Sequence, residues 1–205
     1  MNDQWLDWAK RIQALSQTGL AYSKDIFDIE RYEELRKISV EILSEYTELE
    51  MSKITDLFTN EKGYQTPKVD VRGVVFKDNQ ILMVQENKDN RWSLPGGFCD
   101  VGLSPSENVV KEIKEESGFD VVPVKLLAVL DKNKHPHPPD PYHFYKIFIL
   151  CEITGGEATV GMETNNVQFF SENNLPQLST SRITESQIHS LFEYLWNPEK
   201  ETLFD

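Results

Sequence analysis

Three glutamates stand close together in the middle of this chain of 205 residues. Glu112, Glu115 and Glu116 follow the spacing i, i+3 and i+4, which places their side chains on one face of a helix. Like charges at this spacing repel one another, so a fold that keeps them gains something from the cluster. Carboxylate oxygens suit Mg²⁺, Mn²⁺ or Ca²⁺, and a divalent-cation site is therefore the functional interpretation. A solvated acidic face is the alternative.

The elements around the glutamates are those of a mixed fold. Residues 96–119 read GGFCDVGLSPSENVVKEIKEESGF, which predicts a Gly-Gly turn, a polar loop and then the acidic helix. A further amphipathic helix is predicted near the C-terminus, at 185–196. Runs rich in β-branched and aromatic residues predict strands at 69–76, 81–85, 121–131, 143–153 and 164–170. This order indicates an α+β fold with helices packed on a sheet.

The N-terminal part of the chain has a different, all-helical pattern. Apolar residues recur at helical spacing over 3–17 and again from about Asp28, with a third segment around Ile54, Leu57 and Phe58. About 60 residues is marginal for a domain that stands alone, so this block is expected to pack against the rest of the chain or against a second copy. A polar stretch at 60–68 is typical of a linker.

These patterns predict two domains, a helical domain at 1–63 and a second domain at 64–205. Within the first, Trp5 and Trp8 are interpreted as core residues, with a role as the wall of a ligand pocket as the alternative. Gly19 is interpreted as the stop of the first helix, and Asp28 as the cap of the second.

The charge balance narrows the classes of partner. The chain has 34 acidic and 21 basic residues and a net charge of −13, which argues against a broad basic nucleic-acid surface and against an anionic membrane. No apolar run approaches the length of a membrane span, and the first residues do not resemble a secretory signal. Two cysteines form no recognisable pattern. A cytoplasmic location is therefore expected.

The stretch from Gly97 to Phe119 resembles the Nudix box, G-x5-E-x7-R-E-U-x-E-E-x-G-U with U aliphatic, and the preceding residues WSLPGG resemble the usual approach to it. Leu103 replaces the first glutamate of the pattern and Lys111 replaces its arginine, while Phe119 stands where an aliphatic residue is usual. The positions that match are Gly97, Glu112, Ile113, Glu115, Glu116 and Gly118.

This resemblance implies an α/β/α sandwich and hydrolysis of a nucleoside diphosphate linked to another group X. It also implies that Glu112, Glu115, Glu116 and the backbone carbonyl of Gly97 hold Mg²⁺ or Mn²⁺. Glu115 and Glu116 are expected to be catalytic as well. A bound cation would neutralise the pyrophosphate and activate or orient a water.

In the family the replaced glutamate and arginine form an ion pair that braces the loop against the helix. Leu103 and Lys111 cannot form that pair, and burial of Leu103 is the hypothesis for what replaces it. Because the metal positions are intact, an active enzyme is the favoured interpretation. A Nudix fold that senses nucleotides without hydrolysing them is the alternative from another functional class.

Further candidates lie outside the box. The family often supplies a fourth carboxylate six residues before an aromatic, and Glu163 stands six before Phe169. Glu163 is therefore a candidate metal ligand or general base, with a solvated loop residue as the alternative. His137 and His143 lie in a proline-rich loop and are candidates for substrate binding. Arg182 is a candidate for a phosphate contact, with simple pairing to acidic residues as the alternative.

The whole chain resembles the CDP-choline pyrophosphatases of Gram-positive bacteria, which carry an N-terminal helical domain. This resemblance implies hydrolysis of CDP-choline to CMP and phosphocholine, a homodimer, and trimming of RNA 3′ ends as an additional activity. An ADP-ribose or dinucleotide pyrophosphatase is the alternative within the class. A choline group would call for aromatic walls, for which the candidates are Trp5, Trp8, Tyr22 and Tyr142.

Overall fold

The structure is a computed structural model that describes residues 4–47, 50, 52–54 and 63–205. It divides into two compact units, which we call the helical unit and the sheet unit. The helical unit comprises Met1–Pro67 together with Pro139–His143, and the sheet unit comprises Lys68–Pro138 and Phe144–Asp205. The sequence did not reveal that the short segment 139–143 belongs with the helices.

In the helical unit, α1 (Gln4–Tyr22) packs against α2 (Ile26–Thr47). Helix α1 continues past Gly19, so the predicted stop there is wrong. A side chain at Gly19 would overlap the ring of Tyr32, and the glycine is needed for close approach of the two helices. The cap of α2 is Asp25, whose Oδ1 accepts hydrogen bonds from the backbone of Phe27 at 2.9 Å and of Asp28 at 3.2 Å.

The small core of the helical unit does not include the two tryptophans. Trp5 and Trp8 are 49% and 38% exposed and meet edge to face at 4.8 Å. Their predicted core packing is wrong, because α1 turns other residues toward α2. The buried apolar residues of this unit are Leu6, Ala9, Val40, Leu43 and Ile54. The predicted positions Leu57 and Phe58 lie outside the described residues.

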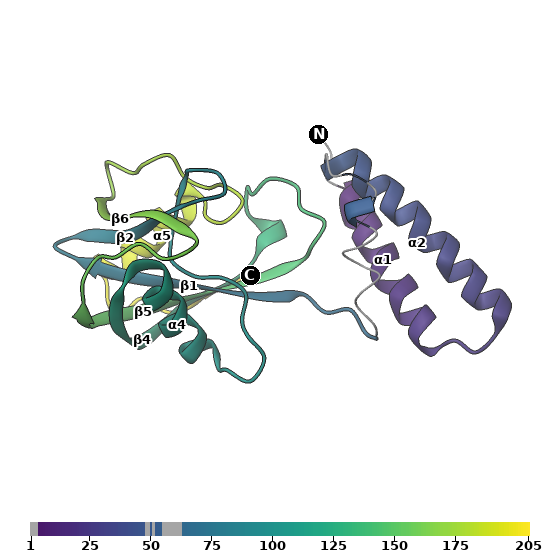
Figure 1. Cartoon of the computed structure of the whole chain (residues 1–205), viewed down its shortest axis with the longest axis horizontal. Helices are drawn as coiled ribbons and strands as arrows, with labels where there is room; N and C mark the ends of the chain where they lie inside the picture. Colours follow the sequence, from purple (N-terminus) through teal and green to yellow (C-terminus); the bar gives the residue numbers. More distant parts are fainter. Residues whose placement is uncertain (1–3, 48–49, 51, 55–62) are drawn as a thin grey trace. The chain divides into compact units, whose positions relative to one another are not determined.

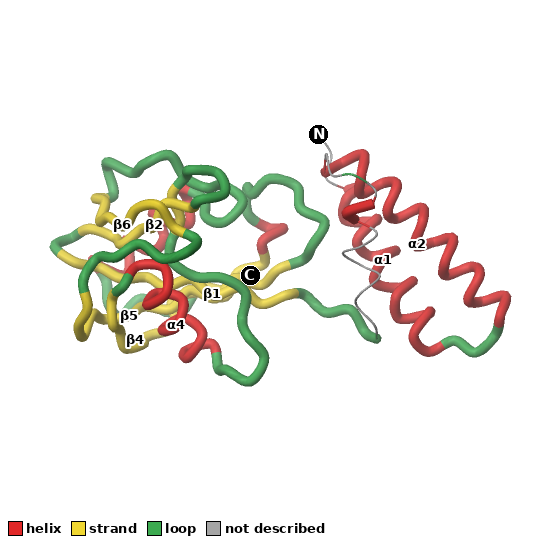
Figure 2. Tube along the Cα trace, viewed as in Figure 1, coloured by secondary structure: helices red, strands yellow, loops and turns green. Residues whose placement is uncertain are grey.

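The sheet unit is built on seven strands in the order β3-β2-β1-β5-β4-β7, with β6 paired to β2 (Figure 2). The pairings β1–β5 and β4–β7 are parallel and the others are antiparallel. The elements are β1 (Lys68–Lys77), β2 (Gln80–Glu86), β3 (Trp92–Ser93), α4 (Pro105–Ser117), β4 (Phe119–Asp131), η1 (Lys132–Lys134), β5 (Phe144–Gly156), β6 (Thr164–Ser171), α5 (Glu185–Trp196) and β7 (Leu203–Phe204).

The two faces of this sheet carry two separate cores, and helices α4 and α5 lie on opposite sides of the sheet (Figure 1). On β1, Val71 and Val75 pack with Ile113 of α4, whereas Val74 packs with Phe192 of α5. The alternation of a β-strand thus sends successive residues to opposite helices. The two helices cover opposite faces, and the expected α/β/α sandwich is confirmed.

One glycine sets how closely α4 approaches the sheet. A side chain on Gly73 of β1 would overlap Ile113, which is fully buried in the centre of α4. Helix α4 therefore rests directly on the backbone of β1.

None of the helices in the described part of the chain has the length and apolar character of a membrane span.

Candidate functional site

The helix α4 is fixed at both ends by strong local signals. Ser104 and Glu107 form a reciprocal capping box, and Pro105 opens the first turn. Gly118 ends the helix in the left-handed conformation, with φ of 79°. The three glutamates lie in the last two turns, where the helix dipole disfavours negative charge. A cation at this end of the helix would offset that penalty.

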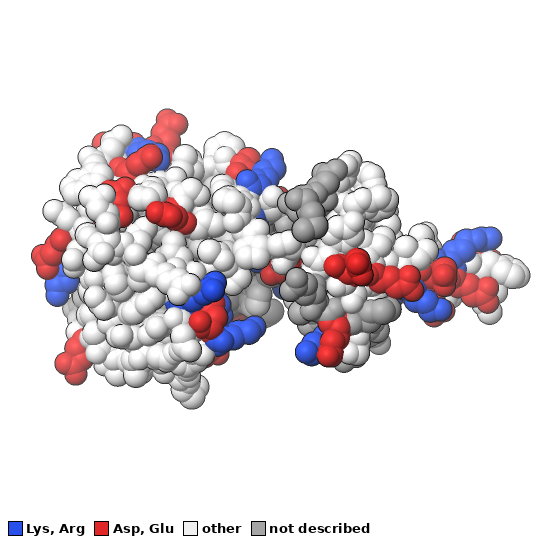
Figure 3. Space-filling view, turned by 90° about the horizontal axis from the view of Figure 1, so that it is seen from above, with Lys and Arg blue, Asp and Glu red and all other residues white. Residues whose placement is uncertain are grey.

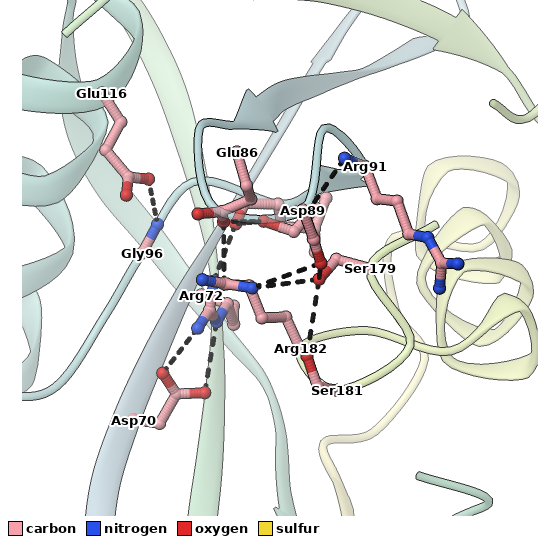
Figure 4. A network of polar contacts seen from close by, with 12 residues as sticks. Asp70, Arg72, Glu86, Asp89, Arg91, Gly96, Glu116, Ser179, Ser181 and Arg182 are labelled. Carbon is pink, nitrogen blue, oxygen red and sulfur yellow. Dashed lines mark hydrogen bonds and ion pairs between the residues drawn. The ribbon is translucent and has the colours of Figure 1, made fainter. Parts of the chain in front are cut away.

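Glu116 is the most buried of the three carboxylates, with 7% of its surface exposed. Its Oε2 accepts a hydrogen bond of 2.8 Å from the backbone N–H of Gly96 (Figure 4). Burial raises the pKa of Glu116 to about 8, although the charge of Arg72 and the bond from Gly96 act in the opposite direction. The free protein therefore holds a proton at this site near neutral pH.

Glu112 of α4 lies beside Gly97, which belongs to the turn that precedes the helix. A side chain on Gly97 would come within 3.2 Å of Oε2 of Glu112, so the glycine leaves room for this carboxylate. Burial raises the pKa of Glu112, and the negative charges of Glu115 and Glu163 raise it further against Lys111 and Arg72. The predicted set of four carboxylates is therefore electrostatically linked through Glu112.

The loop that carries Glu163 is attached to the end of α4. The hydroxyl of Thr164 donates to the backbone carbonyl of Glu116 at 2.9 Å, and a side chain on Gly161 would overlap the carbonyl of Glu115. Asn87 donates its backbone N–H to the carbonyl of Glu163 at 2.9 Å. Glu163 itself is exposed. Its role as a metal ligand or base stays a prediction, and these contacts explain why it lies near Glu112.

The brace of the box loop is rebuilt around Asn108. This side chain is fully buried and accepts a hydrogen bond of 2.8 Å from the backbone of Asp100. It also donates to the carbonyls of Leu103 at 3.2 Å and Ser104 at 3.1 Å. Lys111 adds an exposed ion pair with Asp100 at 2.8 Å. The hypothesis that burial of Leu103 holds the loop is wrong, because Leu103 is 40% exposed.

A buried ionic network lies under the glycine turn, and sequence reasoning missed it. Arg72 donates to both carboxylate oxygens of Asp70, at 2.8 and 3.1 Å, and to the carbonyl of Leu94 at 3.1 Å. Lys146 of β5 pairs with the same carboxylate. Burial alone would raise the pKa of Asp70, but the two cations outweigh it and the pKa is lowered. Charged residues inside the apolar strand sequence VDVRGVVF were the available signal.

Arg182 belongs to a second network at the same end of the sheet (Figure 4). Its Nε pairs with the buried Glu86 at 3.0 Å, and its Nη1 lies 3.7 Å from Asp89 and 3.0 Å from the hydroxyl of Ser179. Ser93 donates to the same carboxylate oxygen of Glu86 at 2.7 Å. The structure thus shows the acid pairing named as the alternative for Arg182, while its phosphate contact stays a prediction.

His137 and His143 fall in different units. Nδ1 of His137 lies 2.7 Å from the carbonyl of Thr180, so this nitrogen carries the proton. Burial lowers the pKa of His137 to about 4, and the nearby charges of Lys146 and Lys132 add to the effect. The ring is neutral at pH 7, and its buried Nε2 has no hydrogen-bond partner among the described residues. His143 belongs to the helical unit, and its predicted role is not tested.

The residues at the end of α4 have the chemistry that Mg²⁺ or Mn²⁺ requires. The donors are hard carboxylate oxygens, and burial raises the pKa of Glu112 and of Glu116. The carbonyl of Gly97 accepts a hydrogen bond of 2.9 Å from Val71 and keeps a second lone pair. Among the described residues, no three acidic, histidine or cysteine side chains converge as a ready-made metal cage.

Two family models match the chain. Residues 3–58 match the model described as UDP-X-like, N-terminal oligomerisation domain, and residues 66–191 match the model of the NUDIX domain. The first match falls in the helical unit, and the second covers most of the sheet unit together with the segment 139–143 of the helical unit.

Several known proteins are similar over all or most of their length. A Bacillus subtilis (strain 168) protein named “Putative ADP-ribose pyrophosphatase YjhB” is 59% identical over 98% of this chain and 97% of its own length. A solved structure described as UDP-X diphosphatase is 34% identical, with 99% and 98% coverage and a TM-score of 0.65. An ADP-ribose pyrophosphatase from Streptococcus suis 89-1591 is 45% identical over 68% of this chain and 100% of its own, with a TM-score of 0.63.

The rebuilt brace predicts unequal effects of two substitutions. Asn108→Ala removes the three hydrogen bonds of a fully buried side chain, and the N–H of Asp100 and the carbonyl of Leu103 lose these partners, so we expect a loss of about 1–3 kcal/mol in the free energy of unfolding. Lys111→Ala removes only the exposed ion pairs with Asp100 and Glu115 and should have a much smaller effect. Urea denaturation of both variants measures the difference. A Lys111→Ala variant as unstable as Asn108→Ala would contradict this account of the brace.

The raised pKa of Glu116 predicts that metal binding releases a proton. Since the folded pKa of about 8 exceeds the ordinary value of 4.5, the free protein loses stability from this group as pH rises through that range. Mg²⁺ needs the ionised carboxylate, so its affinity should rise with pH, by up to about tenfold per unit, until about pH 8. Calorimetric titration in two buffers of different ionisation enthalpy counts the protons. The matched variant Glu116→Gln should release about one proton fewer, and equal release in both proteins would exclude Glu116 as the source.

Proposed function

The chain belongs to the Nudix family, and we propose that this nucleoside diphosphate-X pyrophosphohydrolase acts on ADP-ribose, giving AMP and ribose 5-phosphate. The observation that carries the choice of substrate is the full-length relative that is 59% identical and is named for ADP-ribose. The structure of 45% identity, which matches 68% of this chain, is named for the same substrate. We place ADP-ribose ahead of CDP-choline for this reason.

The acidic end of α4 suits the chemistry of this reaction. Glu112, Glu115 and Glu116 would hold Mg²⁺ or Mn²⁺ with the carbonyl of Gly97, and the ion when bound would neutralise the pyrophosphate and polarise the attacking water. Glu163 is the proposed base, because it is exposed and lies near Glu112. It would take the proton of the water as the oxygen attacks phosphorus and the pyrophosphate bond breaks.

The buried network below the turn has a positioning role in this proposal. Arg72 fixes the carbonyl of Leu94, two residues before the Gly96 N–H that holds Glu116. Its positive charge also keeps the pKa of Glu116 lower than burial alone would make it. Arg72 thus favours both the position and the ionised state of the carboxylate that a cation needs.

CDP-choline remains the second candidate substrate. A role in RNA trimming is less favoured. Acidic and basic side chains are interspersed on the face shown in Figure 3, and the described residues there form no continuous basic patch.

A panel of substrates tests the proposed activity. With Mg²⁺, we expect the purified protein to convert ADP-ribose to AMP at a higher kcat/KM than CDP-choline, UDP-sugars, NADH or a short RNA, with products separated by chromatography. Preference for CDP-choline would reverse the order of the two candidates. Absence of turnover for every nucleoside diphosphate-X compound would contradict the proposal as a whole.

Substitutions of two glutamates, measured in the same assay, test whether Glu116 belongs to the active site. Glu116→Gln should lower kcat by at least about a hundredfold with little change in KM, because it removes a group needed for the reaction rather than for binding. The control is Glu185→Gln, whose side chain is 74% exposed on α5 and which should behave as the wild type. An unchanged kcat in Glu116→Gln would remove Glu116 from the site.

We also propose that the protein is a homodimer formed through the helical unit. The family model that matches residues 3–58 describes an oligomerisation domain. This unit exposes many large apolar side chains, which is typical of an interaction surface. They include Trp5, Trp8, Leu15, Tyr22, Ile26, Phe27, Leu35 and Ile38.

Light scattering coupled to size-exclusion chromatography tests the dimer. We expect twice the mass of 23.7 kDa for the wild type. The double variant Leu35→Glu with Ile38→Glu places charges on neighbouring positions of one face of α2 and should give the monomer mass. Val124→Glu, at a position of β4 that is 51% exposed, is the control and should leave the mass unchanged. A wild-type mass of one chain would refute the proposal.

A further inference from the structure

Phe98 directly follows the glycine turn and is unusually exposed for a large apolar side chain. One face of its ring stacks on Phe144, with a distance of 5.4 Å between the centroids and an angle of 24° between the planes. Phe98 is nevertheless 54% exposed. Because one face is covered and more than half of the residue remains accessible, the other face is open to solvent.

The position of this ring is fixed by the backbone on both sides. Val71 donates its N–H to the carbonyl of Gly97 at 2.9 Å, and Cys99 donates to the carbonyl of Val69 at 3.0 Å. Phe98 is thereby paired with β1, opposite Asp70. The loop cannot withdraw the ring without breaking these bonds.

The residue beneath the ring is itself held in place. Phe144 is 7% exposed, and the Nζ of Lys132 lies 4.7 Å from the centroid of its ring. Phe98 therefore rests on an immobile support. Little conformational freedom of its side chain remains to be lost when a ligand binds.

The ring lies in the segment that organises the acidic site. Gly96 holds Glu116 through its N–H, and Gly97 provides the space beside Glu112. Phe98 is the next residue. A flat apolar surface is thus presented within one residue of the turn at which the pyrophosphate would bind.

We propose that the open face of Phe98 is a stacking platform for the nucleobase of the substrate. The inference rests on the proposed pyrophosphatase function, in which every substrate brings a base whereas X varies. A base would extend the parallel stack of Phe144 and Phe98 by a third ring. Stacking on an aromatic ring requires no particular base, since every base has a π-face. Phe98 therefore gives affinity for nucleotides with little selectivity among bases.

Binding of reaction products tests this role without relying on turnover. Calorimetric titration with AMP, CMP, ribose 5-phosphate and phosphocholine, in the presence of Mg²⁺, compares the wild type with Phe98→Ala and Phe98→Tyr. We expect Phe98→Ala to weaken AMP and CMP about tenfold and to leave ribose 5-phosphate, which has no base, unchanged. Phe98→Tyr keeps the ring and should bind AMP within about twofold of the wild type.

A matched control and two further outcomes make the test decisive. Phe204→Ala removes an aromatic ring that is 81% exposed on β7 and should not change AMP binding. Unchanged AMP affinity in Phe98→Ala would overturn the platform. Equal weakening of ribose 5-phosphate, or weakening of phosphocholine alone, would also overturn it. A wild-type protein that binds AMP through Phe98 but hydrolyses no substrate would leave this inference standing while the proposed function fails.

Discussion

The burial of the Glu116 carboxylate is the electrostatic constraint on which the candidate site of the sheet unit depends. Glu116 is buried at the end of a helix, where desolvation and the helix dipole both oppose its negative charge. The fold offers it one backbone hydrogen bond, from Gly96, and the long-range attraction of Arg72. These do not suffice to ionise it at neutral pH. A bound cation would supply the positive charge that favours ionisation of Glu116.

The ionic network below the turn follows from the same constraint. An arginine placed near Glu116 would itself be costly to bury, and Asp70 balances it with two hydrogen bonds. Lys146 then shares Asp70, so the three buried groups retain a net positive charge whenever Lys146 is protonated. Burial lowers the pKa of Lys146 to about 8, which means that desolvation of its ammonium group outweighs the attraction of Asp70. The positive charge of Arg72 in this network partly offsets the effect of burial on Glu116.

The sequence predicted those features that depend on local spacing. The central helix and its three glutamates followed from the spacing of neighbouring residues, and the sandwich followed from the resemblance to the Nudix box. It could not predict Asn108 as the brace or Lys146 as the partner of Asp70. Their contacts join residues that tertiary structure alone brings together, across 8 and 76 positions of the chain. The prediction that Trp5 and Trp8 are core residues was wrong for a related reason. Periodicity shows which residues share a face of a helix, but it does not show what packs on that face.

The departures of the box from its family pattern can be understood through what each residue touches. The usual ion pair links two points of the loop and helix, and any contact that links them serves the same mechanical purpose. Asn108 does so with three hydrogen bonds made by a side chain that is itself fully buried. Lys111 adds an exposed ion pair with Asp100 of the loop at 2.8 Å, and its ammonium also lies 3.5 Å from Glu115. There it reduces the repulsion within the acidic cluster. The buried amide of Asn108 and the exposed ammonium of Lys111 therefore share the task of holding the loop, and Lys111 also balances the charge.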